Sequence, residues 1–148
     1  HRPRGNCSAV FGGQVIVGDF ENGIIYAFSQ TNYTDNGDTI ACIRRCRHLT
    51  EDLARVFFSD LQVQFQPGVG LIAGQGSNPQ AILRFSDDGG FTWSNDRYAY
   101  LGKLGAYKNR AIWRQLGQAR DRIFEVVVTD PVYRVVVSAN LNATAGAY

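Results

Sequence analysis

The sequence predicts an all-β protein made of antiparallel strands. Short runs of β-branched and aromatic residues recur along its 148 residues, and each run ends at Gly, Asn or Asp. A single segment, residues 50–54, has the pattern of a helical turn, with Thr50 as its N-cap. Many short strands with almost no helix predict either a sandwich or the blades of a β-propeller. Propeller-like blades are the architecture that we expect.

The first half of the chain predicts a hairpin followed by two longer strands. Its runs of strand length are residues 14–17, 24–28, 39–47 and 55–66. The first two runs are joined through Asn22-Gly23, a dipeptide that favours a tight hairpin turn. A polar loop at 31–38 carries a second Asn-Gly pair. The last run alternates bulky and polar side chains except at Ser59-Asp60, where a β-bulge would explain the break.

The second half begins with a Gly-rich loop and continues with closely spaced strands. Residues 67–79 (PGVGLIAGQGSNP) lack the alternation of a strand and predict a loop or an exposed rim. The runs that follow are residues 81–85, 91–94, 97–101, 111–116, 122–129 and 133–139. No linker divides the chain, so residues 1–139 are predicted to form a single β-rich domain. Residues 140–148 are small and polar, which predicts a C-terminal tail.

Composition and charge exclude several classes of protein. The formal net charge of +2 is too small for a dedicated nucleic-acid binder. No apolar run approaches the ~20 residues that a membrane helix requires, and the start of the chain is not a secretory signal. Charged residues make up 19%, below the ~25% of typical soluble domains, so a protein partner is expected to cover part of the surface. The chain begins at His1 without Met, which is expected of a processed product or of part of a longer protein.

The cysteines predict neither a disulfide framework nor a metal site. There are three of them, Cys7, Cys42 and Cys46, and the odd number argues against full pairing. On a strand, the last two would lie about 13 Å apart, which is beyond disulfide reach. With His48 they would supply only part of a tetrahedral metal site, and no fourth ligand is evident. We expect buried, reduced thiols, as is typical of assembly in a cytoplasm, with no metal and no cofactor.

Residues 86–93 (SDDGGFTW) match the Asp-box pattern S-x-D-x-G-x-T-W at every specified position. The residues that define this structural Asp box are Ser86, Asp88, Gly90, Thr92 and Trp93. In a hairpin turn the Asp carboxylate accepts hydrogen bonds from turn amides, and the glycine adopts a positive φ. The Trp ring is expected to be buried against its own hairpin. The pattern therefore predicts a folding device and not a catalytic site.

An enzyme is not expected from the residues present. The Asp box resembles those of sialidases, but no arginine trio with a tyrosine nucleophile is recognisable, and the chain is too short to close a propeller alone. There is also no phosphate loop, no G-x-S-x-G elbow and no H-E-x-x-H motif. No catalytic residue is assigned. A carbohydrate-binding or sialidase-like propeller fragment stays as the alternative function, with Trp93 and Trp113 as the rings that would contact sugar.

Two groups of arginines are candidates for an interface or for the wall of a DNA channel. The candidates are Arg44, Arg45, Arg47, Arg110, Arg114, Arg120 and Arg122. In a strand, alternate side chains point to opposite faces, so neither group lies wholly on one side. Asp121, Glu125 and Asp130 are close enough in sequence to pair with the second group. Ion pairs or contacts between subunits are therefore favoured over phosphate contacts.

Several segments together resemble a known family. They are GDFENGIIY (18–26), YTDNGD (33–38), QPGVGL (66–71), GQGSNPQ (74–80), RFSDDGGFTWSN (84–95), GKLGAYKNRAIWRQLGQARDRIFEV (102–126) and TDP (129–131). In this order and spacing they resemble the C-terminal portion of the packaged-DNA stabilisation proteins. These proteins are the tail hub, or nozzle, of short-tailed double-stranded DNA bacteriophages. Family members are roughly three times longer than this chain and are propeller-like in their larger part.

The resemblance implies a structural virion protein and not an enzyme. Family members form a homo-oligomeric ring, implied to be a hexamer, below the portal and its adaptor. They close the channel after DNA packaging together with a tail needle, and they belong to the conduit through which the genome is ejected. The implied partners are the portal adaptor, the tail needle and the tailspike, with non-specific contact to channel DNA left open. Assembly in the host cytoplasm and localisation in the virion tail follow from the same resemblance.

Overall fold

The computed structural model describes residues 4–52 and 54–146 and contains only strands, turns and loops within them. The chain divides into two compact units, residues 1–32 and residues 33–148. They are called the N-terminal unit and the C-terminal unit below, and each is described by itself. All strand pairs in both units are antiparallel, so the predicted all-β antiparallel class is confirmed.

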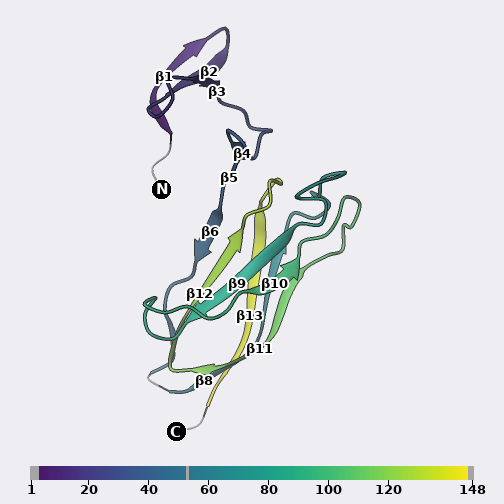
Figure 1. Cartoon of the computed structure of the whole chain (residues 1–148). Helices are drawn as coiled ribbons and strands as arrows, with labels where there is room; N and C mark the ends of the chain where they lie inside the picture. The colour runs from purple at the N-terminus through teal and green to yellow at the C-terminus, as the bar shows by residue number, and fades with distance from the viewer. Residues whose placement is uncertain (1–3, 53, 147–148) are drawn as a thin grey trace. The chain divides into compact units, whose positions relative to one another are not determined.

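The N-terminal unit is a small sheet of order β1-β2-β3 (Figure 1). Its strands are β1 (Gly5–Phe11), β2 (Gln14–Asp19) and β3 (Ile25–Ala27). The predicted hairpin joins β2 to β3, with Gly23 at φ 67° and the side-chain oxygen of Asn22 accepting a hydrogen bond from the Ile24 amide at 2.9 Å. Strand β1 was not predicted. No side chain among its described residues is buried, so this unit has no core of its own.

The C-terminal unit begins with a short hairpin and then forms two larger sheets. Strands β4 (Thr34–Asp35) and β5 (Asp38–Thr39) pair around Asn36-Gly37, inside the segment predicted as a loop. One sheet has the order β10-β9-β12-β6, with β7 also pairing with β12, and the other has the order β11-β8-β13 (Figure 1). The bounds are β6 (Cys42–Arg45), β7 (Leu49–Thr50), β8 (Val56–Phe65), β9 (Gln80–Ser86), β10 (Arg97–Tyr100), β11 (Ala111–Ala119), β12 (Asp121–Val128) and β13 (Val136–Ala145).

These two sheets share one hydrophobic core and therefore form a sandwich. The buried cluster takes side chains from β8, β9, β10, β11 and β12. Across it, the rings of Phe58 and Phe124 meet edge to face with centroids 5.5 Å apart. The strand pattern predicted either a sandwich or propeller-like blades, and we expected the blades. The described residues of the C-terminal unit form the sandwich.

The central strand β8 shows why the alternation of the sequence is interrupted. Buried and outward-facing side chains alternate along it, and the phase changes at Ser59 and Asp60. At that point Asp60 pairs with Asn142 of β13, whereas Phe58 pairs with the next residue of β13, so Ser59 is an extra residue. The predicted bulge is confirmed. It keeps Phe58 and Leu61 on the core side despite their three-residue spacing.

Three local expectations differ from the structure. Residues 140–145 of the predicted tail belong to β13, because this segment pairs with β8; residues 147–148 lie outside the described part of the chain. Residues 50–54 form no helix: the Ala54 amide donates to the Glu51 carbonyl at 2.6 Å and closes a single turn, and residue 53 lies outside the described part. Residues 91–94 form a turn and not a strand, because their amides bond within the Asp box and to β9.

Candidate interaction surfaces

The Asp box is the turn between β9 and β10. The Asp88 carboxylate accepts hydrogen bonds from the Thr92 amide at 2.9 and 3.0 Å, from the Thr92 hydroxyl at 2.5 Å and from the Ser86 hydroxyl at 2.7 Å. These bonds, with the Thr92 hydroxyl first, lower the pKa of Asp88 well below its usual range. The Ser86 hydroxyl also accepts a bond from the Gly90 amide at 2.8 Å. The network accounts for the Ser, Asp and Thr positions of the pattern by geometry alone.

Gly90 and Trp93 complete the turn. Gly90 has a φ of 99°, a conformation that an L side chain rarely adopts, and a Cβ at this position would lie 3.8 Å from the Trp93 ring. The ring is half-buried and not fully buried as expected. The Arg45 guanidinium lies over the ring, 5.1 Å from its centroid. The other candidate sugar-binding ring, Trp113, is buried and donates its Nε1–H to the Arg97 carbonyl at 2.8 Å.

Arg122 is a core residue and not a surface one. Its side chain is 3% exposed and binds Asp87 through two hydrogen bonds of 2.5 and 2.6 Å. It also donates to the Leu116 carbonyl. Its guanidinium lies 4.1 Å from the centroid of Phe85 and 4.9 Å from that of Phe58. The expectation that Arg122 lines an interface or channel is therefore wrong for this unit, because the charge is satisfied inside the sandwich.

This pair links the Asp box to the β11–β12 hairpin. Asp87, which the box pattern leaves unspecified, binds an arginine of β12 whose other partners are carbonyls of β11. Sequence reasoning missed the pair, because 35 residues separate its members. The three acidic residues that were expected to pair with the arginines of 110–122 have other partners. Asp121 lies beside His48, Asp130 accepts the Gln80 amide, and Glu125 binds Arg45.

Arg45 belongs to a charged ladder on the outer face of the sheet that contains β12. Glu125 pairs with Arg45 of β6 on one side and with Arg84 of β9 on the other, where the closest atoms are 3.8 Å apart. Arg84 in turn binds Asp96 at 2.6 Å. This contact lowers the pKa of Asp96 and raises the pKa of Arg84. The Arg45 side chain is thus fixed by its ion pair with Glu125 and by its cation–π contact with Trp93.

The remaining candidate arginines divide between the two lateral edges of the sandwich. Arg110, Arg114 and Arg120 are exposed beside or on β11, at the edge where β10 and β11 contact each other. Arg44 and Arg47 are exposed on or just after β6, which ends the other sheet at the opposite edge. The structure therefore does not bring the two groups together into one continuous path.

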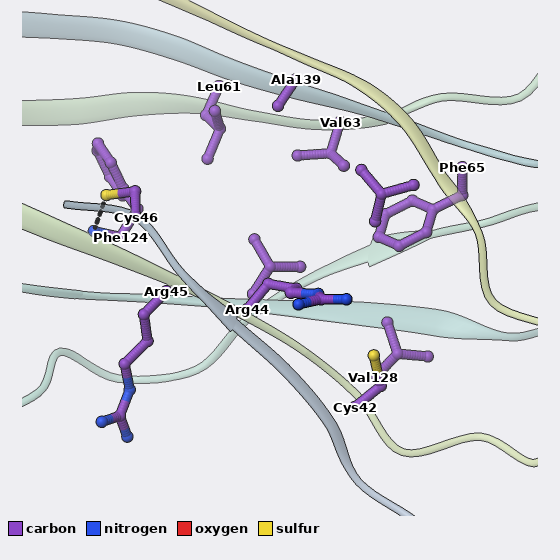
Figure 2. Close-up of a pocket in the computed structure, with 12 residues that line it drawn as sticks. Cys42, Arg44, Arg45, Cys46, Leu61, Val63, Phe65, Phe124, Val128 and Ala139 are labelled. Atoms are coloured by element: carbon purple, nitrogen blue, oxygen red, sulfur yellow. Dashed lines mark hydrogen bonds between the residues drawn. The ribbon is translucent and has the colours of Figure 1, made fainter.

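An apolar cavity of about 320 Å³ opens beside β6 (Figure 2). Its lining residues come from β6, β8, β12 and β13 or directly follow them: Cys42, Arg44, Arg45, Cys46, Leu61, Val63, Phe65, Phe124, Val126, Val128, Val136 and Ala139. Neither tryptophan lines it, so it lacks the rings expected of a sugar site. The sequence carried no signal for this cavity, because its walls come from four strands that are distant along the chain.

The three thiols are more exposed to solvent than expected. Cys42 is half-buried, and Cys7 and Cys46 are exposed, because all three lie on edge strands or directly after one. The Cys46 Sγ accepts a hydrogen bond from the Phe124 amide at 3.1 Å. Within residues 4–52 and 54–146, no three His, Cys, Asp or Glu side chains are grouped as metal ligands. The same residues contain no helix long and apolar enough to cross a membrane.

The comparison with protein families decides the relationship. Residues 42–144 match the family model described as Bacteriophage P22 Gp10, beta-sandwich. The chain belongs to this family. The matched range covers the two-sheet sandwich from β6 to β13 and confirms the resemblance to the phage tail hub proteins. No curated protein matches the chain.

Membership of the P22 Gp10 beta-sandwich family makes the chain a structural component of a phage tail. It places the protein in the virion, where tail proteins assemble into oligomers with other virion proteins. The family does not favour a sugar-directed alternative.

Proposed function

We propose that the chain is part of the tail hub, or nozzle, which closes the portal channel after DNA packaging and forms part of the conduit for ejection. The family match over 42–144 is the observation that carries this proposal. The site geometry is compatible with it, because the carboxylates of the Asp box are hydrogen-bonded to Ser86, Thr92 and Arg122 within the fold. We propose that the role is mechanical, without catalysis, cofactor or metal.

The proposed assembly is a homo-oligomeric ring, a hexamer by family resemblance, with the portal adaptor, tail needle and tailspike as neighbours. Neighbours in a ring contact each other through two different surfaces of one subunit. The sandwich offers two unlike lateral edges, one with Arg110, Arg114 and Arg120 and the other with Arg44 and Arg47. We propose the first group as a contact between subunits and assign propeller-like blades to the longer proteins of the family.

The test is DNA retention in particles assembled with and without the chain. We expect particles that lack it to package DNA and then lose it, and we expect the purified protein to restore retention when it is added to them. The proposal would be contradicted by particles that keep their DNA and eject it normally without the chain. A separate glycan-binding screen of the purified chain is expected to give no affinity above background.

A further inference from the structure

The two lateral edges of the sandwich are closed to different extents. At the β10–β11 edge, the Arg97 guanidinium donates to the carbonyls of Arg114 and Gln115 at 2.8 and 3.1 Å. The Trp113 Nε1–H donates a hydrogen bond to the Arg97 carbonyl, so the two strands are linked in both directions. At the opposite edge, the end strands are β6 and β13, and no strand pairing joins them within the described residues. The apolar cavity lies at this open edge.

Strand β13 lies at the end of its sheet, and a β-bulge at Val137 interrupts its pairing with β8. The strand is ten residues long, VVSANLNATA, and contains neither a charged residue nor a proline. One side pairs with β8, and the other has no strand partner within the described part of the chain. Natural edge strands usually carry charges or proline that prevent pairing with another chain. Val136 and Val137 at its start are 46% and 60% exposed, so apolar surface continues from the cavity onto this edge.

Arg44 supplies a positive charge on the inner side of the same opening. It pairs in register with Val126, so both side chains lie on one face of the sheet, the face that borders the cavity. Arg44 and Arg45 both line the cavity, and Figure 2 shows their side chains pointing in different directions. The lining contains no acidic residue, and no ion pair of Arg44 occurs within residues 4–52 and 54–146. A carboxylate at this position would complement both the charge and the apolar walls.

We propose that this open edge binds an extended, acidic segment of another virion protein, which adds a strand to β13. Alternate apolar side chains of the segment fill the cavity, and an Asp or Glu carboxylate meets Arg44. Addition of a strand to a free sheet edge is a recurring mode of peptide recognition, in which pockets select alternate side chains. The proposal rests on the proposed tail function only for the source of the segment.

Charge favours this occupant over a second copy of the same edge. A symmetric pair of copies would bring Arg44 and Arg47 of each copy towards those of the other, and the edge strand β13 offers no carboxylate to compensate. Like charges placed together at an interface oppose association. An acidic strand gains both the main-chain hydrogen bonds of β13 and the arginine contact.

Synthetic peptides test the edge on the full-length chain without any other tail protein. The probe is a peptide of about ten residues with alternating Val and Thr and a central Glu, matched to the ten residues of β13. A second peptide has Lys in place of Glu. The readout is the rate at which a maleimide reacts with Cys42 and Cys46, which line the cavity. Cys7 is exposed in the N-terminal unit and serves as an internal control.

The Glu peptide is expected to slow the reaction of Cys42 and Cys46 but not that of Cys7, and to bind about fivefold more tightly than the Lys peptide. Arg44→Glu should reverse this preference. Ala139→Phe, which fills the cavity, should abolish protection. Ala143→Phe is the matched control, since Ala143 is exposed on the same strand but does not line the cavity.

Several results would overturn the proposal and leave the tail function unaffected. Protection by neither peptide would exclude strand addition at this edge. Equal protection by both peptides would show an apolar site without selection for acid. Concentration-dependent self-association that Ala139→Phe abolishes would identify a second copy as the occupant. Failure of the proposed tail function is distinguishable, because it would appear in DNA retention and not in thiol protection.

Discussion

The ion pair of Arg122 and Asp87 predicts an unequal response to loss of its two members. The Arg122 side chain is 3% exposed, whereas that of Asp87 is 43% exposed. Asp87→Ala leaves a buried cation with only carbonyl and ring partners. Removing one member of a buried pair costs about 3–5 kcal/mol. Because those other partners remain, we expect Asp87→Ala to destabilise the chain by about 3 kcal/mol, the lower end of that range.

Arg122→Met is expected to cost less. The half-exposed Asp87 carboxylate can rehydrate, and Met retains much of the apolar volume against Phe58 and Phe85. The main loss is the donor to the Leu116 carbonyl, with a cost of about 2 kcal/mol. In the double variant the buried charge and its partner are both absent. Its cost should therefore lie close to that of Arg122→Met alone, about 2 kcal/mol, and below the sum of the single costs.

Urea unfolding of the isolated chain measures these differences as shifts of the midpoint at constant m-value. Arg114→Met is the matched control, because its side chain is exposed, and it should change the free energy of unfolding by less than about 0.5 kcal/mol. The reasoning would be refuted if Asp87→Ala cost less than Arg122→Met. Strict additivity in the double variant would refute it as well.

Three further predictions concern the Asp box and the exposed arginines. Gly90→Ala should destabilise the chain by about 1–3 kcal/mol in thermal or urea unfolding, because an alanine would have to adopt a φ of 99°; an unchanged midpoint would contradict this. The pKa of Asp88 is lower in the folded than in the unfolded state, so its carboxylate stabilises the fold above its ordinary pKa of 3.8, and this contribution is lost as the pH falls towards the folded value. Unfolding measured between neutral pH and pH 3 should therefore show the gap between wild type and Asp88→Asn narrowing with acidity, and a gap that widens would refute the assignment. Replacement of Arg114 and Arg120 by Ser should weaken oligomer formation in sedimentation experiments, whereas normal assembly with reduced DNA retention would place both on the channel wall.

The sequence was sufficient to predict the class of fold and two local features, one bulge and one hairpin turn. Alternation at 55–66 predicted β8 together with its bulge, and Asn22-Gly23 predicted the β2–β3 hairpin, because both signals depend only on neighbouring residues. The choice between sandwich and propeller was not accessible in this way. It depends on how separate strands pair, and β8 pairs with β11 and β13, both more than 40 residues further along the chain.

The candidate surface was predicted less completely than the fold. Alternation along β6 correctly implied that Arg44 and Arg45 point to opposite faces. It could not show that Arg45 finds Glu125 and Trp93, or that Arg122 is buried, because those partners come from distant strands. The cavity beside β6 likewise depends on which strands end the two sheets.

The central claim is that the chain is a structural subunit of an oligomeric phage tail hub, and the mass of the native assembly tests it most directly. The measurement is native mass spectrometry of the chain alone and together with the portal, its adaptor and the other tail proteins. The account predicts a closed ring, or stoichiometric incorporation into the tail below the portal. A chain that stays monomeric and joins no tail complex under these conditions would contradict it.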